Sequence, residues 1–118
     1  MARLGIVVAV SENTPPLKSL TACKNDGDAF SSILKETGRF DEILVLSQAS
    51  DTTSKSVKSN ISDLVERYKG QQIEEVVFYF SGHGDFVGTD FYHILADFDP
   101  TSRNQTSLAN SELDGLIR

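Results

Sequence analysis

The sequence has little of what several classes of protein depend on. Its 118 residues include a single cysteine, which excludes a disulfide framework within the chain and a metal site built from cysteines. A lone cysteine is typical of a reducing compartment, so we expect a cytoplasmic protein. The two histidines, His83 and His93, do not have the spacing of a zinc site.

Basic residues and long apolar runs are also few. Eleven Lys and Arg against seventeen Asp and Glu give a net charge of -6, without a basic patch, which argues against a nucleic-acid partner. The first ten residues contain an apolar run that is too short to span a membrane, and no cleavage-site pattern follows it. We therefore expect no membrane partner either.

Three apolar runs predict the strands of a parallel sheet. Leu4–Val10, Ile43–Leu46 and Val76–Phe80 are rich in β-branched or aromatic residues. The third run, with five apolar residues in a row, is typical of a central strand that helices cover on both sides. Between the first two strands, Ser11–Leu20 carries Pro15 and Pro16 and predicts a loop.

Two helices are predicted between these strands. An asparagine or aspartate at the N-cap, Asn25 or Asp26, begins the first helix, and Gly38 ends it. Apolar residues recur at helical spacing over Val57–Tyr68, and Gly70 closes this second helix. The alternation of strands and helices predicts an α/β domain with βαβ units.

The remaining residues predict a small antiparallel element. Residues 85–99 suggest a β-hairpin that turns near Gly88, and residues 101–107 suggest a polar loop. A last helix, capped by Ser107 or Asn110 and carrying Leu113, then reaches Arg118 after barely two turns. Because this helix has no following strand to cross over to, we expect the gene to continue beyond Arg118.

His83 is the main candidate for chemistry. It lies between Gly82 and Gly84, just after a buried strand, where open α/β sheets bind their ligands. Its imidazole either fills a structural role in a loop or acts as a general acid and base. In the second case, a backbone N–H beside it, unshielded by a side chain, can donate to a developing oxyanion.

Two motifs resemble those of the caspase-like cysteine peptidases, particularly the metacaspase and bacterial caspase-homologue branch. Val77–Gly84 (VFYFSGHG) is similar to the histidine motif of that family. Leu20–Asp26 (LTACKND) is similar to its Leu-x-Gly-Cys-x-Asn-Asp motif, with Ala22 in place of the usual glycine. The resemblance implies a caspase-like three-layer sandwich with a mostly parallel sheet, incomplete at the C-terminus, in which residues 1–118 are the N-terminal, large-subunit-like portion.

The resemblance also implies a mechanism. His83 is then the catalytic histidine and the Gly84 N–H an oxyanion donor, while the nucleophilic cysteine lies beyond residue 118 or on a second subunit. Cys23 corresponds to a non-catalytic cysteine of the family, although a helix N-terminus can lower the pKa of a thiol. We therefore expect a cysteine endopeptidase whose present fragment is inactive by itself.

Asp26 has two interpretations, which do not exclude each other. Its position suits a helix cap. The resemblance implies instead that its carboxylate lines the substrate pocket and selects Arg or Lys before the cut, since both cations need an anionic acceptor when desolvated. Caspases proper use an arginine to accept aspartate, and residues 20–22 contain none.

The other polar residues are less specific. Several acids gather around the predicted hairpin: Asp85, Asp90, Asp97 and Asp99. Oxygen-rich loops can bind Ca²⁺, and several metacaspases are activated by calcium, but solvated loop acids are the simpler interpretation, and we expect no obligatory cofactor. His93 is expected to be a packed or surface histidine of a strand.

Two functions from other classes remain open at this point. One is a caspase-like pseudoenzyme or partner subunit that keeps the fold and acts by docking to another protein. The other is a flavodoxin-like module in which Asp26 or Asp85 contributes to a ligand site. No glycine-rich phosphate loop follows the first strand, which argues against the second.

Overall fold

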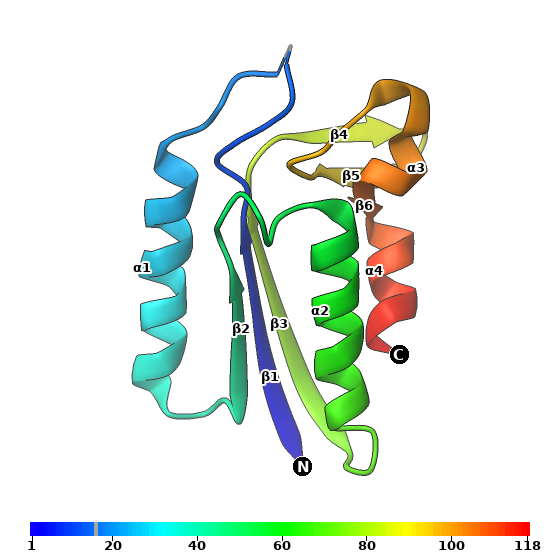
Figure 1. The fold of residues 1–118 in the computed structure, drawn as a ribbon. Helices are drawn as coiled ribbons and strands as arrows, with labels where there is room; N and C mark the ends of the chain where they lie inside the picture. Colours follow the sequence, from blue (N-terminus) through cyan, green and yellow to red (C-terminus); the bar gives the residue numbers. More distant parts are fainter. Residues whose placement is uncertain (16) are drawn as a thin grey trace.

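A computed structural model describes residues 1–15 and 17–118 of the chain, so that Pro16, part of the predicted loop, lies outside the described residues. The elements, in chain order, are β1 (Ala2–Ala9), α1 (Ala22–Thr37), β2 (Glu42–Leu46), α2 (Ser54–Arg67), β3 (Ile73–Ser81), β4 (Gly84–Val87), β5 (Asp90–Ile94), the 3₁₀ turn η1 (Pro100–Ser102), α3 (Arg103–Thr106), β6 (Ser107–Ala109) and α4 (Asn110–Ile117). Figure 1 shows three layers, with α1 on one face of the larger sheet and α2 and α4 on the other. The predicted α/β sandwich with a mostly parallel sheet is confirmed.

The larger sheet has the order β2-β1-β3, and both pairs of neighbours are parallel. The chain moves from β1 to β2 and then back past β1 to β3. Two crossovers of the same hand that run in opposite directions place their helices on opposite faces. Figure 1 shows this arrangement for α1 and α2.

The prediction that Val76–Phe80 forms the central strand was wrong for the described residues. The central strand is β1, whose residues are buried almost throughout, whereas β3 pairs only with β1 and is partly exposed along its length. The apolar run of β3 serves both of its faces, because Val76, Phe78 and Phe80 pack against the main core whereas Tyr79 stacks on Phe30 of α1 (ring centroids 4.2 Å apart). An apolar run thus shows that a strand contacts a core, but it does not show on how many sides the strand is paired.

Helix α1 begins at Ala22, three residues before the earlier of the two predicted caps. Thr21 occupies the N-cap without a side-chain bond, and the first-turn amides find acceptors elsewhere. The Lys24 N–H donates to the Ser11 hydroxyl oxygen (N–O 3.0 Å), and the Cys23 N–H donates to the Leu20 carbonyl (N–O 3.1 Å). The predicted capping role of Asn25 or Asp26 was therefore wrong, because Ser11, two residues after the end of β1, substitutes for a local cap.

The other predicted helix ends, which are the C-termini of α1 and α2 and the N-terminus of α4, agree with the structure in part. Gly38 ends α1 with φ 65°, a left-handed conformation that favours glycine, as predicted. Helix α2 ends at Arg67 with Tyr68 as its C-cap, so Gly70 lies beyond the helix. Ala109 is the N-cap of α4, and neither predicted cap, Ser107 or Asn110, takes that position.

The smaller sheet has the order β4-β5-β6 and is antiparallel. The predicted hairpin is confirmed, with Gly88 in the turn at φ 64°. The predicted polar loop over residues 101–107 was wrong, because it contains η1 and α3 and runs into β6. Ser107–Ala109 pairs with β5 and carries the buried Leu108, so this short strand fixes the hairpin to the core.

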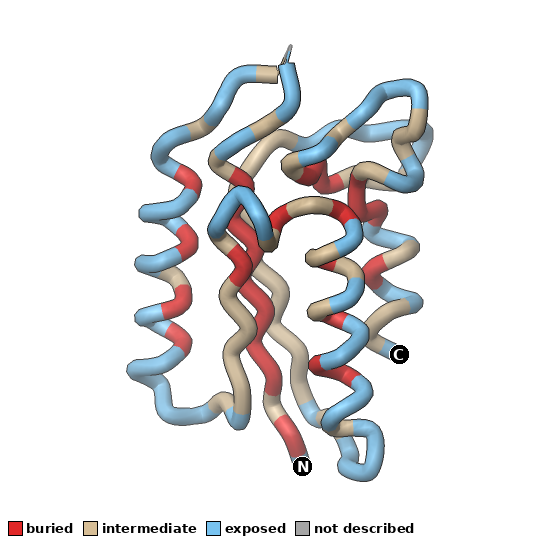
Figure 2. Tube along the Cα trace, in the orientation of Figure 1, coloured by how far each residue is buried: buried red, intermediate tan, exposed pale blue. Residues whose placement is uncertain are grey.

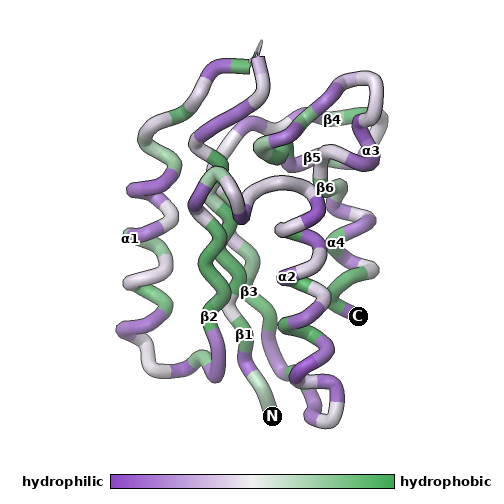
Figure 3. Tube along the Cα trace, in the orientation of Figure 1, coloured by the Kyte–Doolittle hydropathy of each residue, from purple (hydrophilic) through white to green (hydrophobic). Residues whose placement is uncertain are grey.

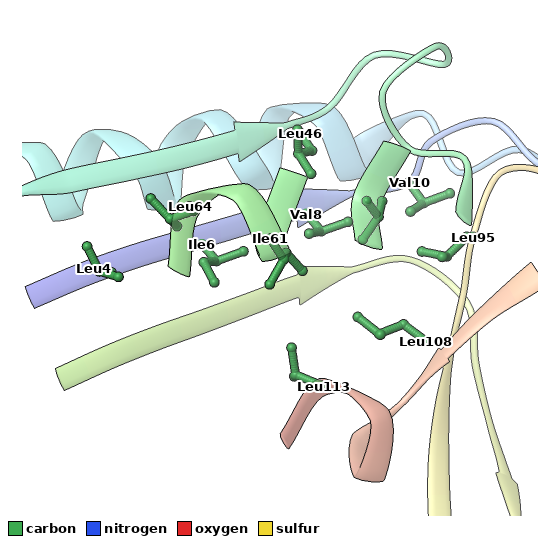
Figure 4. Close-up of a cluster of buried hydrophobic side chains, with 11 residues drawn as sticks. Leu4, Ile6, Val8, Val10, Leu46, Ile61, Leu64, Leu95, Leu108 and Leu113 are labelled. Atoms are coloured by element: carbon green, nitrogen blue, oxygen red, sulfur yellow. The ribbon is translucent and has the colours of Figure 1, made fainter. Parts of the chain in front are cut away.

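The main core lies on the face of the sheet that α2 and α4 cover. Alternate residues of β1 point to this face, as the period of a strand requires. The buried cluster consists of Leu4, Ile6, Val8, Val10, Leu46, Val57, Ile61, Leu64, Leu95, Leu108 and Leu113 (Figure 4). Figure 2 shows the buried positions along β1 and the inner face of α2, and Figure 3 shows hydrophobic residues along the three strands of the sheet.

Candidate active site

The predicted site residues gather at the carboxyl ends of β1 and β3. The segments that follow these adjacent strands lead to opposite sides of the sheet, which is the kind of switch point where open α/β sheets bind ligands. The Val10 N–H donates to the Ser81 carbonyl (N–O 2.8 Å) and extends the pairing of the two strands to their ends. The loop before α1 and the start of the hairpin therefore begin from a fixed pair of strand ends.

His83 is half-buried and bonded through one ring nitrogen. Its Nε2 lies 2.8 Å from the carbonyl oxygen of Lys18, in the loop that leads into α1. Since a carbonyl only accepts, Nε2 carries the hydrogen, and in the neutral ring Nδ1 then holds the lone pair. The loop thus fixes both the tautomer and the plane of the ring.

The loop that supplies this carbonyl is closed at its base. The Leu20 N–H donates to the Ser11 carbonyl (N–O 2.7 Å), and the Ser11 hydroxyl accepts from Lys24. Sequence reasoning missed both Ser11 and Lys18. The contribution of Lys18 comes from its backbone, so no side-chain signal could have shown it, whereas a hydroxyl directly after a strand was a usable signal.

Gly84 begins β4 immediately after His83. It is exposed, and a Cβ built on it would lie 2.1 Å from Cζ of Phe91, so any side chain here would overlap the Phe91 ring. The register pairs Gly84 with His93, while the neighbouring Ile94 N–H donates to the His83 carbonyl (N–O 3.0 Å). Hydrogen-bonded and non-bonded pairs alternate in an antiparallel ladder, so the Gly84 N–H points away from β5.

Asp26 lies in the second turn of α1 and is exposed. The Ser81 hydroxyl donates to its Oδ2 over a long O–O distance of 3.5 Å, which brings the carboxylate to the end of β3, two residues before His83. In the part of the chain that the structure describes, no ion pair involves Asp26, whereas Lys24 pairs with Asp28 one turn away (N–O 3.7 Å). The carboxylate is therefore available to a cation from outside.

A comparison with protein families agrees with this arrangement. The family model described as the caspase domain matches residues 4–116, which is nearly the whole chain. The chain belongs to the caspase domain family. This family consists of cysteine peptidases, and the α/β architecture is compatible with its fold. The flavodoxin-like alternative is not favoured, and no curated protein matches the chain.

The only cysteine of this caspase-family chain is buried in the first turn of α1. Cys23 is 6% exposed, and among the described residues no hydrogen bond joins its thiol to His83. A buried thiol in such a place behaves as a small apolar side chain. Its position gives no support for a nucleophilic role.

The acids around the hairpin are engaged within the chain. Asp85 pairs with Arg103 (O–N 2.9 Å), and Asp97 accepts bonds from the backbone N–H and hydroxyl of Ser54. Asp90 and Asp99 likewise accept bonds from Ser111 and Thr101. Residues 1–15 and 17–118 contain no group of three or more acidic, histidine or cysteine side chains that could hold a metal ion. The same ranges contain no helix that is long and apolar enough to cross a membrane.

His93, in the hairpin strand β5, is buried. It is 7% exposed, its Nδ1 donates to the Leu108 carbonyl (N–O 2.8 Å), and three phenylalanine rings meet it edge to face. Burial lowers the pKa of His93 from its usual 6.5, against the opposing effects of the Leu108 bond and the Asp90 charge. Of the two predicted alternatives for His93, a packed or a surface histidine of a strand, the structure shows the packed one.

The fold should lose stability below neutral pH because of His93. As the pH falls through 6.5, the unfolded chain binds a proton that the folded, neutral histidine does not, so the free energy of unfolding falls. One proton limits this loss to about 1.4 kcal/mol per pH unit. Urea unfolding of the protein between pH 7.5 and 5.5 measures it.

A matched pair of variants identifies the group responsible. His93→Leu should flatten the dependence of unfolding free energy on pH in this range, whereas His83→Ala, which keeps His93, should retain it. An unchanged pH dependence in His93→Leu would show that other groups cause the loss.

Proposed function

We propose that the chain is the N-terminal, large-subunit-like portion of a cysteine endopeptidase that cleaves after Arg or Lys. The observation that carries the proposal is the presence of two suitable groups on adjacent residues. The tautomer of His83 is fixed by the Lys18 carbonyl, and the exposed N–H of Gly84 points away from its own sheet. Family membership supports a cysteine as the nucleophile.

The two groups suit the two halves of the chemistry. Nδ1 of His83 can take the proton of an attacking thiol as the C–S bond forms, and it can give this proton to the leaving nitrogen as the peptide C–N bond then breaks, so that the proton ends on the new amine. The Gly84 N–H can donate to the carbonyl oxygen as it becomes an oxyanion. Water then releases the acyl group and restores the thiol.

The nucleophile is proposed to come from outside these 118 residues. Among the described residues β3 pairs only with β1, so the other edge of β3 can accept a further strand. A strand added there ends beside His83, because parallel strands share their carboxyl edge. A cysteine at the end of this strand, from the same protein or from a second subunit, would lie beside His83, where the mechanism needs the nucleophile.

The preference for a basic residue is supported by Asp26. Its exposed carboxylate lies at the end of β3, beside the strand end that carries His83, and has no ion-pair partner among the described residues. A carboxylate binds the guanidinium of Arg in a bidentate manner and the ammonium of Lys as a point charge. The residue before the cut would thus enter from the α1 side.

The test uses the protein expressed from its complete gene and three peptides that differ only in the residue before the cut. We expect the Arg peptide to be hydrolysed at least about tenfold faster, in kcat/KM, than its neutral citrulline counterpart. The Asp peptide should be cut more slowly than either, and a thiol-alkylating reagent should abolish the activity. Assays with and without Ca²⁺ show whether calcium activates the enzyme.

The outcomes separate the competing functions. Absence of cleavage of all three peptides, with and without Ca²⁺, would refute the proposal and favour a caspase-like partner subunit that acts by docking. Cleavage without a preference for Arg would retain the peptidase but remove Asp26 as the selecting group.

A further inference from the structure

The strand that follows His83 has an open edge. β4 is at the end of the smaller sheet and pairs only with β5 among the described residues. All four of its residues are exposed, and Phe86 and Val87 expose 68% and 46% of their surface. Figure 1 shows β4 above the carboxyl ends of the larger sheet.

The hydrogen-bonding phase of the hairpin shows which groups lie on this edge. The bond from the Ile94 N–H to the His83 carbonyl makes these two residues a bonded pair. By alternation, the next pair, Gly84 with His93, is non-bonded, and so is Phe86 with Phe91. The N–H and C=O groups of Gly84 and Phe86 therefore point outward, away from β5.

Nothing in β4 protects this edge. Proteins usually block open edges with Pro, Lys, a bulge or a covering segment. β4 contains neither Pro nor Lys, and its one charged residue, Asp85, is paired with Arg103. Exposed apolar side chains on an unblocked edge are typical of a strand that pairs with another polypeptide.

We infer that the substrate segment after the scissile bond binds here, as a parallel strand added to β4. This inference rests on the proposed function, in which the residue before the cut reaches Asp26 on the α1 side. The chain beyond the cut must then leave on the other side of His83, where β4 begins. The same Gly84 N–H that holds the scissile carbonyl is the first outward group of the free edge.

Parallel pairing defines the bonds. With the scissile carbonyl on the Gly84 N–H, the Gly84 carbonyl accepts from the N–H of the second residue after the cut. The carbonyl of that same residue accepts from the Phe86 N–H. The third residue after the cut lies beside the exposed Phe86 side chain, which favours an apolar residue there.

The test compares Phe86→Pro with Phe86→Ala in the protein from the complete gene. Both variants lose the aromatic ring of Phe86, but only proline removes the outward N–H. Proline leaves the bonds to β5 intact, because the N–H of residue 86 does not point to β5. On a peptide with three residues after the cut, kcat/KM of the proline variant should be about five- to tenfold below that of the alanine variant. On a substrate whose leaving group is a chromogenic amine, the two variants should be equal.

A modified substrate tests the other bond. Methylation of the backbone nitrogen of the second residue after the cut should lower kcat/KM of the wild type about five- to tenfold. Methylation of the third nitrogen, which points away from β4 in parallel pairing, should have a smaller effect. Equal effects of the two methyl groups would overturn the parallel arrangement.

The remaining outcomes separate this inference from the proposed function. If the wild type cuts both substrates and the proline and alanine variants never differ, the free edge does not bind substrate and only the inference falls. If the variants differ in dimer content rather than in kcat/KM, the edge pairs with a second copy of the protein, which also overturns it. If the wild type cuts no substrate, the proposed function and the inference fall together.

Discussion

His83→Ala should lower kcat/KM of the protein from the complete gene by about a thousandfold on an Arg-containing peptide, since positioned acid–base groups contribute about 10²- to 10⁴-fold. The variant loses the nitrogen that exchanges the proton between thiol and amine. It keeps the backbone bond from the Ile94 N–H to the His83 carbonyl, which fixes the start of the hairpin. The fold should therefore survive the change.

Lys18→Ala is the matched control for this variant. The Lys18 side chain is exposed, and its contact with His83 is made by the backbone carbonyl, which alanine retains. Its kcat/KM should stay within about threefold of the wild type, because alanine keeps the carbonyl that holds the His83 ring. The fold should also be unaffected, since an exposed substitution of this kind changes the free energy of unfolding by only about 0.5 kcal/mol. If His83→Ala retained most of the activity, the histidine would be structural and the peptidase proposal would lose its base.

The secondary structure was largely predictable because it depends on local patterns. The apolar runs that became β1, β2 and β3, and the helical spacing of α2, follow from the periods of strand and helix. The hairpin followed from a turn around Gly88. β6 escaped because three residues are too few to show a period, and its strand character comes from pairing with β5.

The errors arose where distant residues decide the local structure. The start of α1 moved forward because the Ser11 hydroxyl, thirteen residues before Lys24, accepts from the first turn. The position of β3 at the edge of the described sheet depends on which strands lie beside it, and apolar content carries no such information. The same limit applies to the candidate site. His83, Gly84 and Asp26 were predicted from sequence motifs, whereas the contribution of the distant Lys18 carbonyl could not be predicted in this way.

Asp26→Asn should lower kcat/KM for the Arg peptide by about 10- to 100-fold and leave the citrulline peptide nearly unchanged. A hydrogen bond to a charged group contributes about 1.5–3 kcal/mol, and each 1.4 kcal/mol corresponds to a factor of ten. Asparagine has the same shape, and its amide oxygen can still accept from Ser81, so the change removes charge rather than structure. The ratio of the two peptides is the measurement.

Asp28→Asn is the control that the helix itself provides. Asp28 is an exposed carboxylate on α1, two residues after Asp26, but it pairs with Lys24. Both variants change the net charge by the same amount, so a general electrostatic attraction of cationic peptides would weaken equally in the two. Only direct contact of the substrate cation with Asp26 predicts that Asp26→Asn lowers the Arg-to-citrulline ratio while Asp28→Asn preserves it. Equal losses in both would assign the preference for basic residues to the acidic surface as a whole, and the Asp26 site would have to be abandoned.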